Sequence, residues 1–448
     1  MQDEAPRAPS DSSPRAPSVE GTSTQSEGAP WHPLKRHAFR FATVYFVLYA
    51  LSYPISVVPL GTKLTSWPGP IWERIVDLVG THVFGLTPEL VQRNINGSGD
   101  TTFDYVQLFS ILVMSILGAL LWWGLDRRRP HYRLPAVALM IAVRFFVGAV
   151  IIFYGFGKTF NLQFGVPSLT RLITTYGDSS PMGLAWTFMG ASPGYSMFAG
   201  LGEVIGGLLL FFRRTTTLGA LILFAVMTNV VMLNLCYDIP VKIFSSHLLL
   251  LVCALLIPDL KRMAAFAMNR PTQGVEIPPL FTQPRLQTAA KVVNVVVVAV
   301  LLQFNISVAR IFLAEDAVVP PLYGIHDVEA FAVNGEERPP LLTDDRRWRS
   351  IVFARPGRVA IQNMDGTLTR LRLQLDLEQG SMVLSGFEGQ DPDVEARWTL
   401  ERPSPKVLEL VGELDGDSIR IRTREREPGG FLLSERGFRW ISERPFNR

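Results

Sequence analysis

The chain has 448 residues, of which 48% are hydrophobic and 19% charged, with a formal net charge of +3 and two cysteines. The small net charge, with basic residues in short clusters beside apolar runs, argues against a nucleic-acid partner and favours a lipid bilayer. Cys236 and Cys253 form no CxxC pair and no zinc spacing, so we interpret them as small buried hydrophobic residues.

Residues 1–30 are rich in Ala, Pro, Ser, Glu and Gly, and the motif PRAPS occurs twice in them. Such a composition cannot bury a core, so we predict a disordered tail. No apolar run follows a basic start, so the segment is not interpreted as a secretory signal.

Seven apolar stretches approach the length of about 20 residues that a helix needs to cross a bilayer. The sixth of them is short. They are Ala38–Leu60, Phe103–Leu125, Pro135–Phe160, Ser192–Phe212, Thr215–Tyr237, Val241–Pro258 and Thr288–Leu313.

Every alternate connection between these stretches is basic, which predicts a cytoplasmic N-terminus by the positive-inside rule. Seven crossings then place the C-terminal region on the periplasmic or extracellular side. The basic residues are Lys35, Arg36 and Arg40, then Arg127, Arg128, Arg129 and Arg133, then Arg213 and Arg214, and then Lys261, Arg262 and Arg270.

Two outer loops have apolar patterns of their own. Between Ile71 and Phe84 the apolar residues recur at helical spacing, which predicts a short interfacial helix with Trp67 and Trp72 at headgroup level. The loop Asn161–Ala191 is semi-polar and is expected to contribute a second capping element.

From about Pro320 the period changes to two, as in the strictly alternating stretch from Arg370 to Leu377. Asn334-Gly335, Asp365-Gly366 and Asp415-Gly416 are typical of hairpin turns. Seven or eight strands fit before Glu443, so we predict a small antiparallel β barrel or sandwich.

These patterns divide the chain into five parts. They are a cytoplasmic tail (1–34), a two-helix extension with an outer loop (35–134), a four-helix bundle (135–262), a linker with the seventh span (263–319) and a soluble outer β domain (320–448).

Ionisable side chains inside spans are costly and usually face the bundle interior. Arg144 and Glu203 each lie about nine residues from the inner end of their span, so we expect a buried ion pair between them. Such a pair could orient a ligand or relay a proton, or it could only fix the helix register.

A second polar group gathers near the outer ends of the spans and is the candidate ligand pocket. Its members are Tyr154, Lys158, Asn229, Asn234, Asp238, Lys242 and His247. No second histidine lies near His247, so no metal or haem site is predicted.

Three segments between Arg144 and Pro258 carry a family resemblance: VRFFVGAVIIFYGFGKTF, GLGEVIGGLLLFFRRTTTLGALIL and FSSHLLLLVCALL. They resemble the DoxX family of bacterial membrane proteins. The resemblance covers about a quarter of the chain and implies a four-helix bundle with Arg144, Lys158 and Glu203 at positions typical of the family. Tyr154 stands where many members carry a histidine.

Some DoxX relatives are subunits of thiosulfate–quinone oxidoreductase, and others accompany thiol-linked oxidative-stress systems. The segment GSGDTTFDYVQ (97–107) and the closing GFRWISERPFNR look like features of a longer DoxX-like subgroup.

Three hypotheses about function remain open at this stage. The first is a redox-linked subunit of the bacterial cytoplasmic (inner) membrane, with a quinone between its helices and a redox partner protein. The second is a non-enzymatic scaffold that presents the β domain. The third is a small-molecule transporter, which we favour least because the chain shows no inverted repeat. The sequence decides neither the substrate nor whether the protein is an enzyme.

Overall fold

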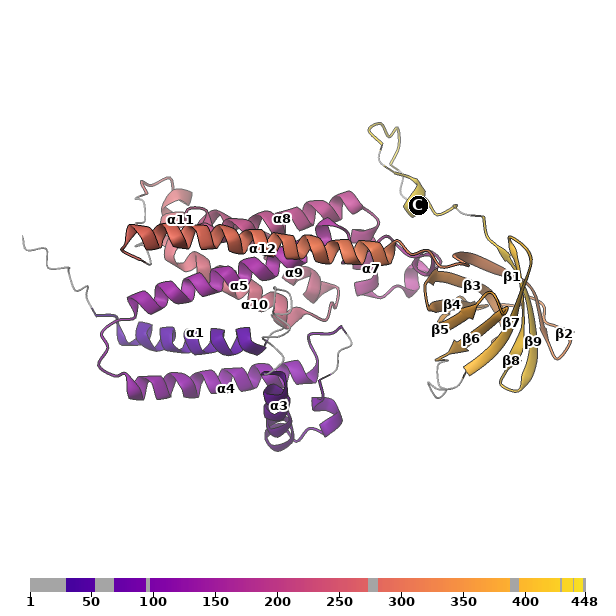
Figure 1. Cartoon of the computed structure of the whole chain (residues 1–448), viewed down its shortest axis with the longest axis horizontal. Helices are drawn as coiled ribbons and strands as arrows, with labels where there is room; N and C mark the ends of the chain where they lie inside the picture. The colour runs from indigo at the N-terminus through magenta and orange to yellow at the C-terminus, as the bar shows by residue number, and fades with distance from the viewer. Residues whose placement is uncertain are drawn as a thin grey trace, which may run out of the picture.

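The computed structural model describes residues 30–52, 68–93, 97–272, 281–386, 395–427, 429–437 and 439–445, except the side chain of Asp316. The rest of the predicted tail (1–29), the outer end of the first predicted span and Trp67 lie outside these residues. A helical bundle occupies one end of the long axis and a β barrel the other (Figure 1).

Within the described residues, six helices are long and apolar enough to cross a membrane, and they match the last six predicted spans. These are α4 (Thr102–Leu125), α5 (Arg133–Thr159), α8 (Pro193–Phe211), α9 (Thr216–Cys236), α10 (Lys242–Leu256) with its continuation through η4 (Ile257–Asp259) and α11 (Leu260–Ala267), and α12 (Pro284–Asp316). The chain is therefore a multi-pass helical membrane protein in contact with the lipid bilayer.

Lipid contact also explains the exposed apolar side chains of these helices. Leu117 and Leu121 on α4 are 59% and 65% exposed, and Val293 on α12 is 60% exposed. Such surfaces would be a liability in water but are ordinary against hydrocarbon. One prediction is corrected here: Cys236 is exposed on α9 and not buried, because a lipid-facing surface accepts a small apolar side chain.

The first predicted span is described only in part, as α1 (Pro33–Ser52). The first half of this helix carries Lys35, Arg36 and Arg40, and its predicted apolar continuation, residues 53–60, lies outside the described residues. A membrane crossing by α1 therefore stays a prediction.

Helices α5, α8, α9 and α10 share one buried core, in which Val147, Leu210, Leu223 and Val252 are fully buried. Glycines on α5 and α8 allow these two helices to approach closely. A Cβ atom on Gly200 would lie 2.6 Å from the carbonyl oxygen of Gly155. Helix α12 packs across α5 and α8 from outside, with Leu301 against their side chains.

The N-terminal extension packs beside this core (Figure 1). Tyr49 of α1, Trp72 of α3 (Pro68–Phe84) and Ile111 of α4 form one buried cluster. The helix predicted around Ile71–Phe84 is thus confirmed as a helix. A short 3-10 helix, η2 (Pro88–Val91), follows it.

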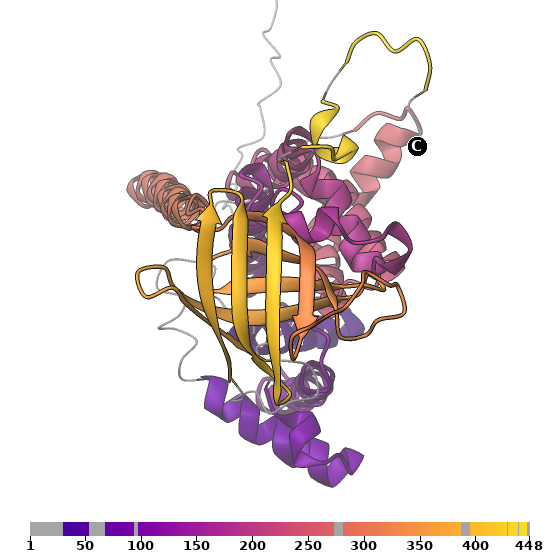
Figure 2. The ribbon, with the colours of Figure 1, turned by 90° about the vertical axis from the view of Figure 1, so that its right-hand side faces the viewer.

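The C-terminal region is a closed antiparallel barrel, which settles the choice between barrel and sandwich (Figure 2). Among the described residues, eight strands close because β1 pairs with both β3 and β9, while the short β2 pairs with β1. The strands are β1 (Gly324–Val333), β2 (Glu336–Glu337), β3 (Trp348–Arg355), β4 (Arg358–Asn363), β5 (Leu368–Asp376), β6 (Ser381–Ser385), β7 (Glu395–Ser404), β8 (Val407–Leu414) and β9 (Asp417–Glu425).

The predicted hairpin turns and alternation are confirmed in the barrel. Asn334-Gly335 and Asp415-Gly416 have both residues at positive φ, as a type I′ turn requires. Inward side chains fill the barrel interior, with Trp348 and Trp398 in ring contact at 5.3 Å. A short helix, α13 (Leu432–Glu435), follows β9.

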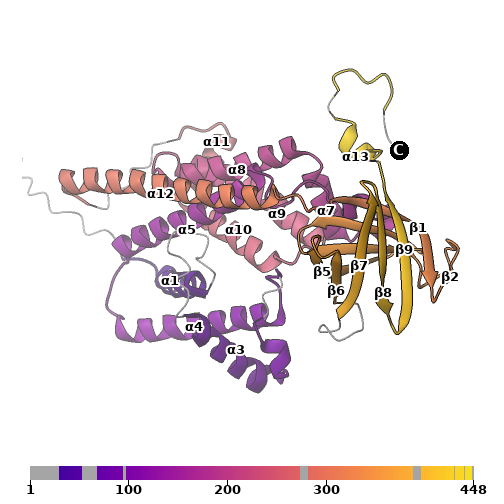
Figure 3. The same ribbon diagram turned by 45° about the vertical axis from the view of Figure 1, so that its right-hand side comes forward.

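The second outer loop forms α6 (Leu169–Leu172), η3 (Tyr176–Asp178) and α7 (Pro181–Gly190), and it lies between the bundle and the barrel (Figure 3). Leu169 and Ile173 pack against a small apolar cluster on the outer face of the barrel that includes Val352 and Ala360. The barrel is therefore docked on the bundle as well as tethered to it by α12.

Candidate functional site

The buried charges of the bundle lie between α5 and α8. The Lys158 ammonium donates to both carboxylate oxygens of Glu203, at 2.6 and 2.8 Å, and the two residues are 8% and 2% exposed. Gly155 and Gly200 each precede one of these residues by three positions, so their contact sets the pair in register. A buried pair with both oxygens satisfied has most of its desolvation cost offset.

The predicted Arg144–Glu203 pair is wrong. The Arg144 guanidinium donates through Nε and Nη2 to the carbonyl oxygen of Leu210, at 2.9 and 2.7 Å. Leu210 lies in the last turn of α8, where carbonyl groups lack helical partners, so Arg144 caps that helix. Glu203 lies seven residues away along α8, about 10 Å by helical rise.

The other predicted pocket residues are divided among several separate contacts. Tyr154 packs against Phe244, Asn229 is exposed on α9, and the Asn234 amide donates to Ser245 Oγ at 2.9 Å. Asp238 accepts from Lys242 Nζ at 2.8 Å across one helical turn.

His247 contacts two tyrosines of α1 that the sequence interpretation missed. Its Nδ1 lies 2.7 Å from the carbonyl oxygen of Ile243, which can only accept, so Nδ1 carries the proton. Nε2 is then the acceptor for the Tyr45 hydroxyl at 2.5 Å. The Tyr49 ring stacks on the imidazole with centroids 4.5 Å apart. The spacing of four between the tyrosines was the available signal, since it places both on one helix face.

Asp100 gives the segment GSGDTTFDYVQ a structural role. Its carboxylate accepts from the backbone N–H groups of Lys242 and Ile243, at 2.7 and 2.9 Å, and lies 3.9 Å from Lys242 Nζ. It therefore caps the start of α10 from a position 142 residues earlier in the chain. Thr101 and Asp104 form a capping box on α4 in the same segment.

Arg40 is a further buried cation, beyond its value as a signal of membrane topology. It is 1% exposed and donates to Tyr132 Oη at 3.0 Å and to the Asp126 carbonyl at 2.9 Å. These bonds join α1 to the connection between α4 and α5.

No family model matches this chain, and no solved structure matches it. The chain is 32% identical over 155 residues to the uncharacterized protein YwoB of Bacillus subtilis (strain 168). The match covers 34% of this chain and 95% of YwoB. The chain belongs to the YwoB family.

Membership of the YwoB family assigns no activity to this chain. The YwoB match spans about a third of the present chain. Among the described residues of the bundle, the Lys158–Glu203 pair and the Tyr45–His247 contact are the candidates for a functional site.

Proposed function

We propose that this protein is a DoxX-like protein of the bacterial cytoplasmic membrane that binds a quinone-class headgroup in the bundle. The observation that carries the proposal is the hydrogen bond between the Tyr45 hydroxyl and His247, both half-buried. A quinone carbonyl accepts hydrogen bonds, and a tyrosine hydroxyl that now donates to an imidazole can turn to donate to that carbonyl. Lys158 is a weaker candidate because Glu203 already holds it.

The walls around this contact suit an aromatic ring with an apolar tail. Tyr49 stacks on His247, and its ring also meets Phe146 edge-on, with centroids 6.4 Å apart. Small-molecule sites combine such apolar walls with a few polar groups that orient the ligand. Electrons would come from a redox partner protein or a bound substrate.

The proposal places the N-terminus in the cytoplasm and the barrel outside. The Arg36 guanidinium donates to the Arg129 carbonyl at 3.1 Å, so two of the basic connections lie together. The barrel is at the opposite end of the bundle from α11 and from the connection between α4 and α5 (Figure 1). Basic connections far from the barrel are what the positive-inside rule expects. Reporter fusions after Arg129, Asn269 and Arg448 should read inside, inside and outside.

Quinone binding is tested by extracting the full chain in mild detergent and quantifying co-purified quinone by mass spectrometry. Tyr45→Phe and His247→Phe should each lower the bound amount several-fold without lowering yield. Tyr195→Phe, at an exposed tyrosine of α8, is the matched control and should retain quinone. Equal quinone in all four proteins would reject the proposal.

A scaffold function is the second candidate, and the filled barrel interior favours it. A barrel with a packed core offers partners only its outer surface and ends. If deleting residues 320–448 abolishes a cellular phenotype that His247→Phe leaves intact, the scaffold function is supported over quinone binding.

A further inference from the structure

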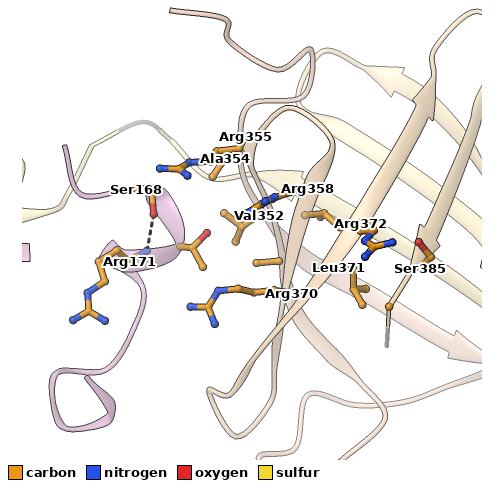
Figure 4. A pocket seen from close by; sticks show the side chains of 14 residues that line it. Ser168, Arg171, Val352, Ala354, Arg355, Arg358, Arg370, Leu371, Arg372 and Ser385 are labelled. Atoms are coloured by element: carbon orange, nitrogen blue, oxygen red, sulfur yellow. Dashed lines mark hydrogen bonds between the residues drawn. The ribbon is translucent and has the colours of Figure 1, made fainter. Parts of the chain in front are cut away.

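A cavity of about 560 Å³ lies where the second outer loop meets the barrel (Figure 4). Its size is in the usual range for small-molecule sites, about 300–1,000 Å³. One wall comes from the loop around α6 and the other from strands β3 to β6. The cavity is lined by five arginines: Arg171, Arg355, Arg358, Arg370 and Arg372.

Strand register places three of these arginines side by side. Arg355 is the cross-strand partner of Arg358, and Arg358 is in turn the partner of Arg372. Arg370 is the partner of Ala360 on the same outer face. Like charges directly opposite each other on adjacent strands are destabilising. The barrel thus retains a repulsion that a bound anion would remove.

In the part of the chain that the structure describes, Arg355, Arg358, Arg370 and Arg372 have no carboxylate at salt-bridge distance. All four are exposed, and Arg171 directs its Nε to Thr187 Oγ1 at 2.6 Å. The opposite side of the barrel differs. There Arg422 lies 3.6 Å from Glu409, and Arg424 pairs with Glu329.

We propose that this cavity binds a phosphate-bearing anion. Guanidinium groups bind phosphate oxygens through paired, charge-assisted N–H donors, and several arginines on one surface are the usual means of recognising a phosphate. Ser168, Thr170 and Ser385 add hydroxyl donors at the rim. Ala354 and Ala360 also line the cavity.

The phosphate can come from a lipid headgroup or from a soluble molecule. The cavity adjoins the loop that leaves α5 at Thr159 and enters α8 at Pro193, so it lies near the end of two spans. An anionic phospholipid headgroup is accessible there, and so is a soluble phosphate from the aqueous side. The experiment needs one arm for each source.

The test uses the full chain in an uncharged detergent with inorganic pyrophosphate as the soluble probe. A second arm compares melting temperatures in phosphatidylcholine nanodiscs with and without phosphatidylglycerol. We expect the wild type either to bind pyrophosphate or to melt at a higher temperature with phosphatidylglycerol, or both. The double variant Arg358→Gln/Arg372→Gln should lose that response, with pyrophosphate affinity falling roughly tenfold for each guanidinium removed.

Arg422→Gln/Arg424→Gln is the matched control, because it removes two exposed arginines from the ion-paired side of the same barrel. It should bind as the wild type does. In pure phosphatidylcholine, Arg358→Gln/Arg372→Gln should melt no lower than the wild type, since a cross-strand repulsion is gone. If that variant fails to fold, Arg355→Gln at the end of β3 replaces it.

Binding of pyrophosphate identifies a soluble ligand, and stabilisation by phosphatidylglycerol alone identifies a lipid headgroup. A wild type that responds to neither probe overturns the proposal. So does an Arg358→Gln/Arg372→Gln variant with wild-type affinity, or a control variant that loses binding equally. The cavity is separate from Tyr45 and His247, so this outcome does not depend on quinone binding.

Discussion

The bundle and the barrel treat charge in different ways. In the bundle, Lys158 has the Glu203 carboxylate and Arg144 has the Leu210 carbonyl, and both cations are buried. On the barrel most charges are exposed, and one side pairs its arginines with carboxylates while the side around β3 to β5 leaves Arg358 opposite Arg372. In hydrocarbon a charge needs a partner to be tolerated, whereas in water pairing is optional. The informative feature of the barrel is therefore the placement of Arg358 directly opposite Arg372, because like charges on adjacent strands repel each other.

The largest expected effect is at the buried pair. Lys158→Met or Glu203→Leu alone should lower the free energy of unfolding by about 3–5 kcal/mol, and the double variant should lose less than the sum. Equilibrium unfolding in detergent gives the coupling. Arg144→Met combined with Glu203→Leu should instead be additive, because the two side chains do not share a partner. Additive losses for Lys158 and Glu203 would contradict the assigned pairing.

The close packing of α5 against α8 holds the Lys158–Glu203 pair in place. Disturbing this packing should therefore give the next largest loss of stability. Gly200→Ala should destabilise the bundle by about 1–3 kcal/mol, since its Cβ would lie 2.5 Å from the Thr159 backbone nitrogen. Gly194→Ala on the same helix is the control, because nothing lies within 4 Å of its Cβ position. Equal melting temperatures for both variants would show that the α5–α8 contact is looser than described.

His326 is a buried titratable group in the barrel, so the contrast between buried charges in the bundle and exposed charges on the barrel has an exception. Burial lowers the pKa of its imidazole below the ordinary value of about 6.5. The unfolded chain then takes up a proton that the folded chain refuses, so stability falls as pH drops below about 6.5, by at most about 1.4 kcal/mol per pH unit. Melting of wild type and His326→Gln between pH 7.5 and 5 should diverge. A parallel loss in both proteins would assign the pH dependence elsewhere.

The smallest effect is expected on the ion-paired side of the barrel. Arg424→Gln should change the melting temperature little at low salt and not at all at high salt, because an exposed pair with Glu329 is screened. Arg358→Gln should be neutral or stabilising in the same titration. A clear loss of stability for Arg358→Gln without ligand would mean that its guanidinium has a structural partner.

The sequence predicted the elements well because the signals are local. Apolar length identified the six described spans, and strict alternation with Asn-Gly and Asp-Gly turns identified the strands. The outer helix at Pro68–Phe84 followed from its own periodicity.

Pairing between elements could not be predicted in the same way. Counting residues from span ends gave similar depths for Arg144 and Glu203, but depth does not fix which faces meet. The useful signal was the shared spacing of Gly155 before Lys158 and Gly200 before Glu203, which locates the contact. The juxtaposition of Arg358 and Arg372 likewise depends on strand register, which alternation alone leaves open.

The cap that Asp100 supplies to α10 bears on how the protein can be divided. Residues 35–134 were predicted as an extension outside the four-helix core. The Asp100 carboxylate in this extension nevertheless accepts from two backbone amides in the first turn of α10. A trimmed version beginning at α5 would leave those two amides without their acceptor. The smallest portion that can be excised intact therefore includes the extension from Asp100 onward, with all of α4, and this part of the extension belongs to the bundle.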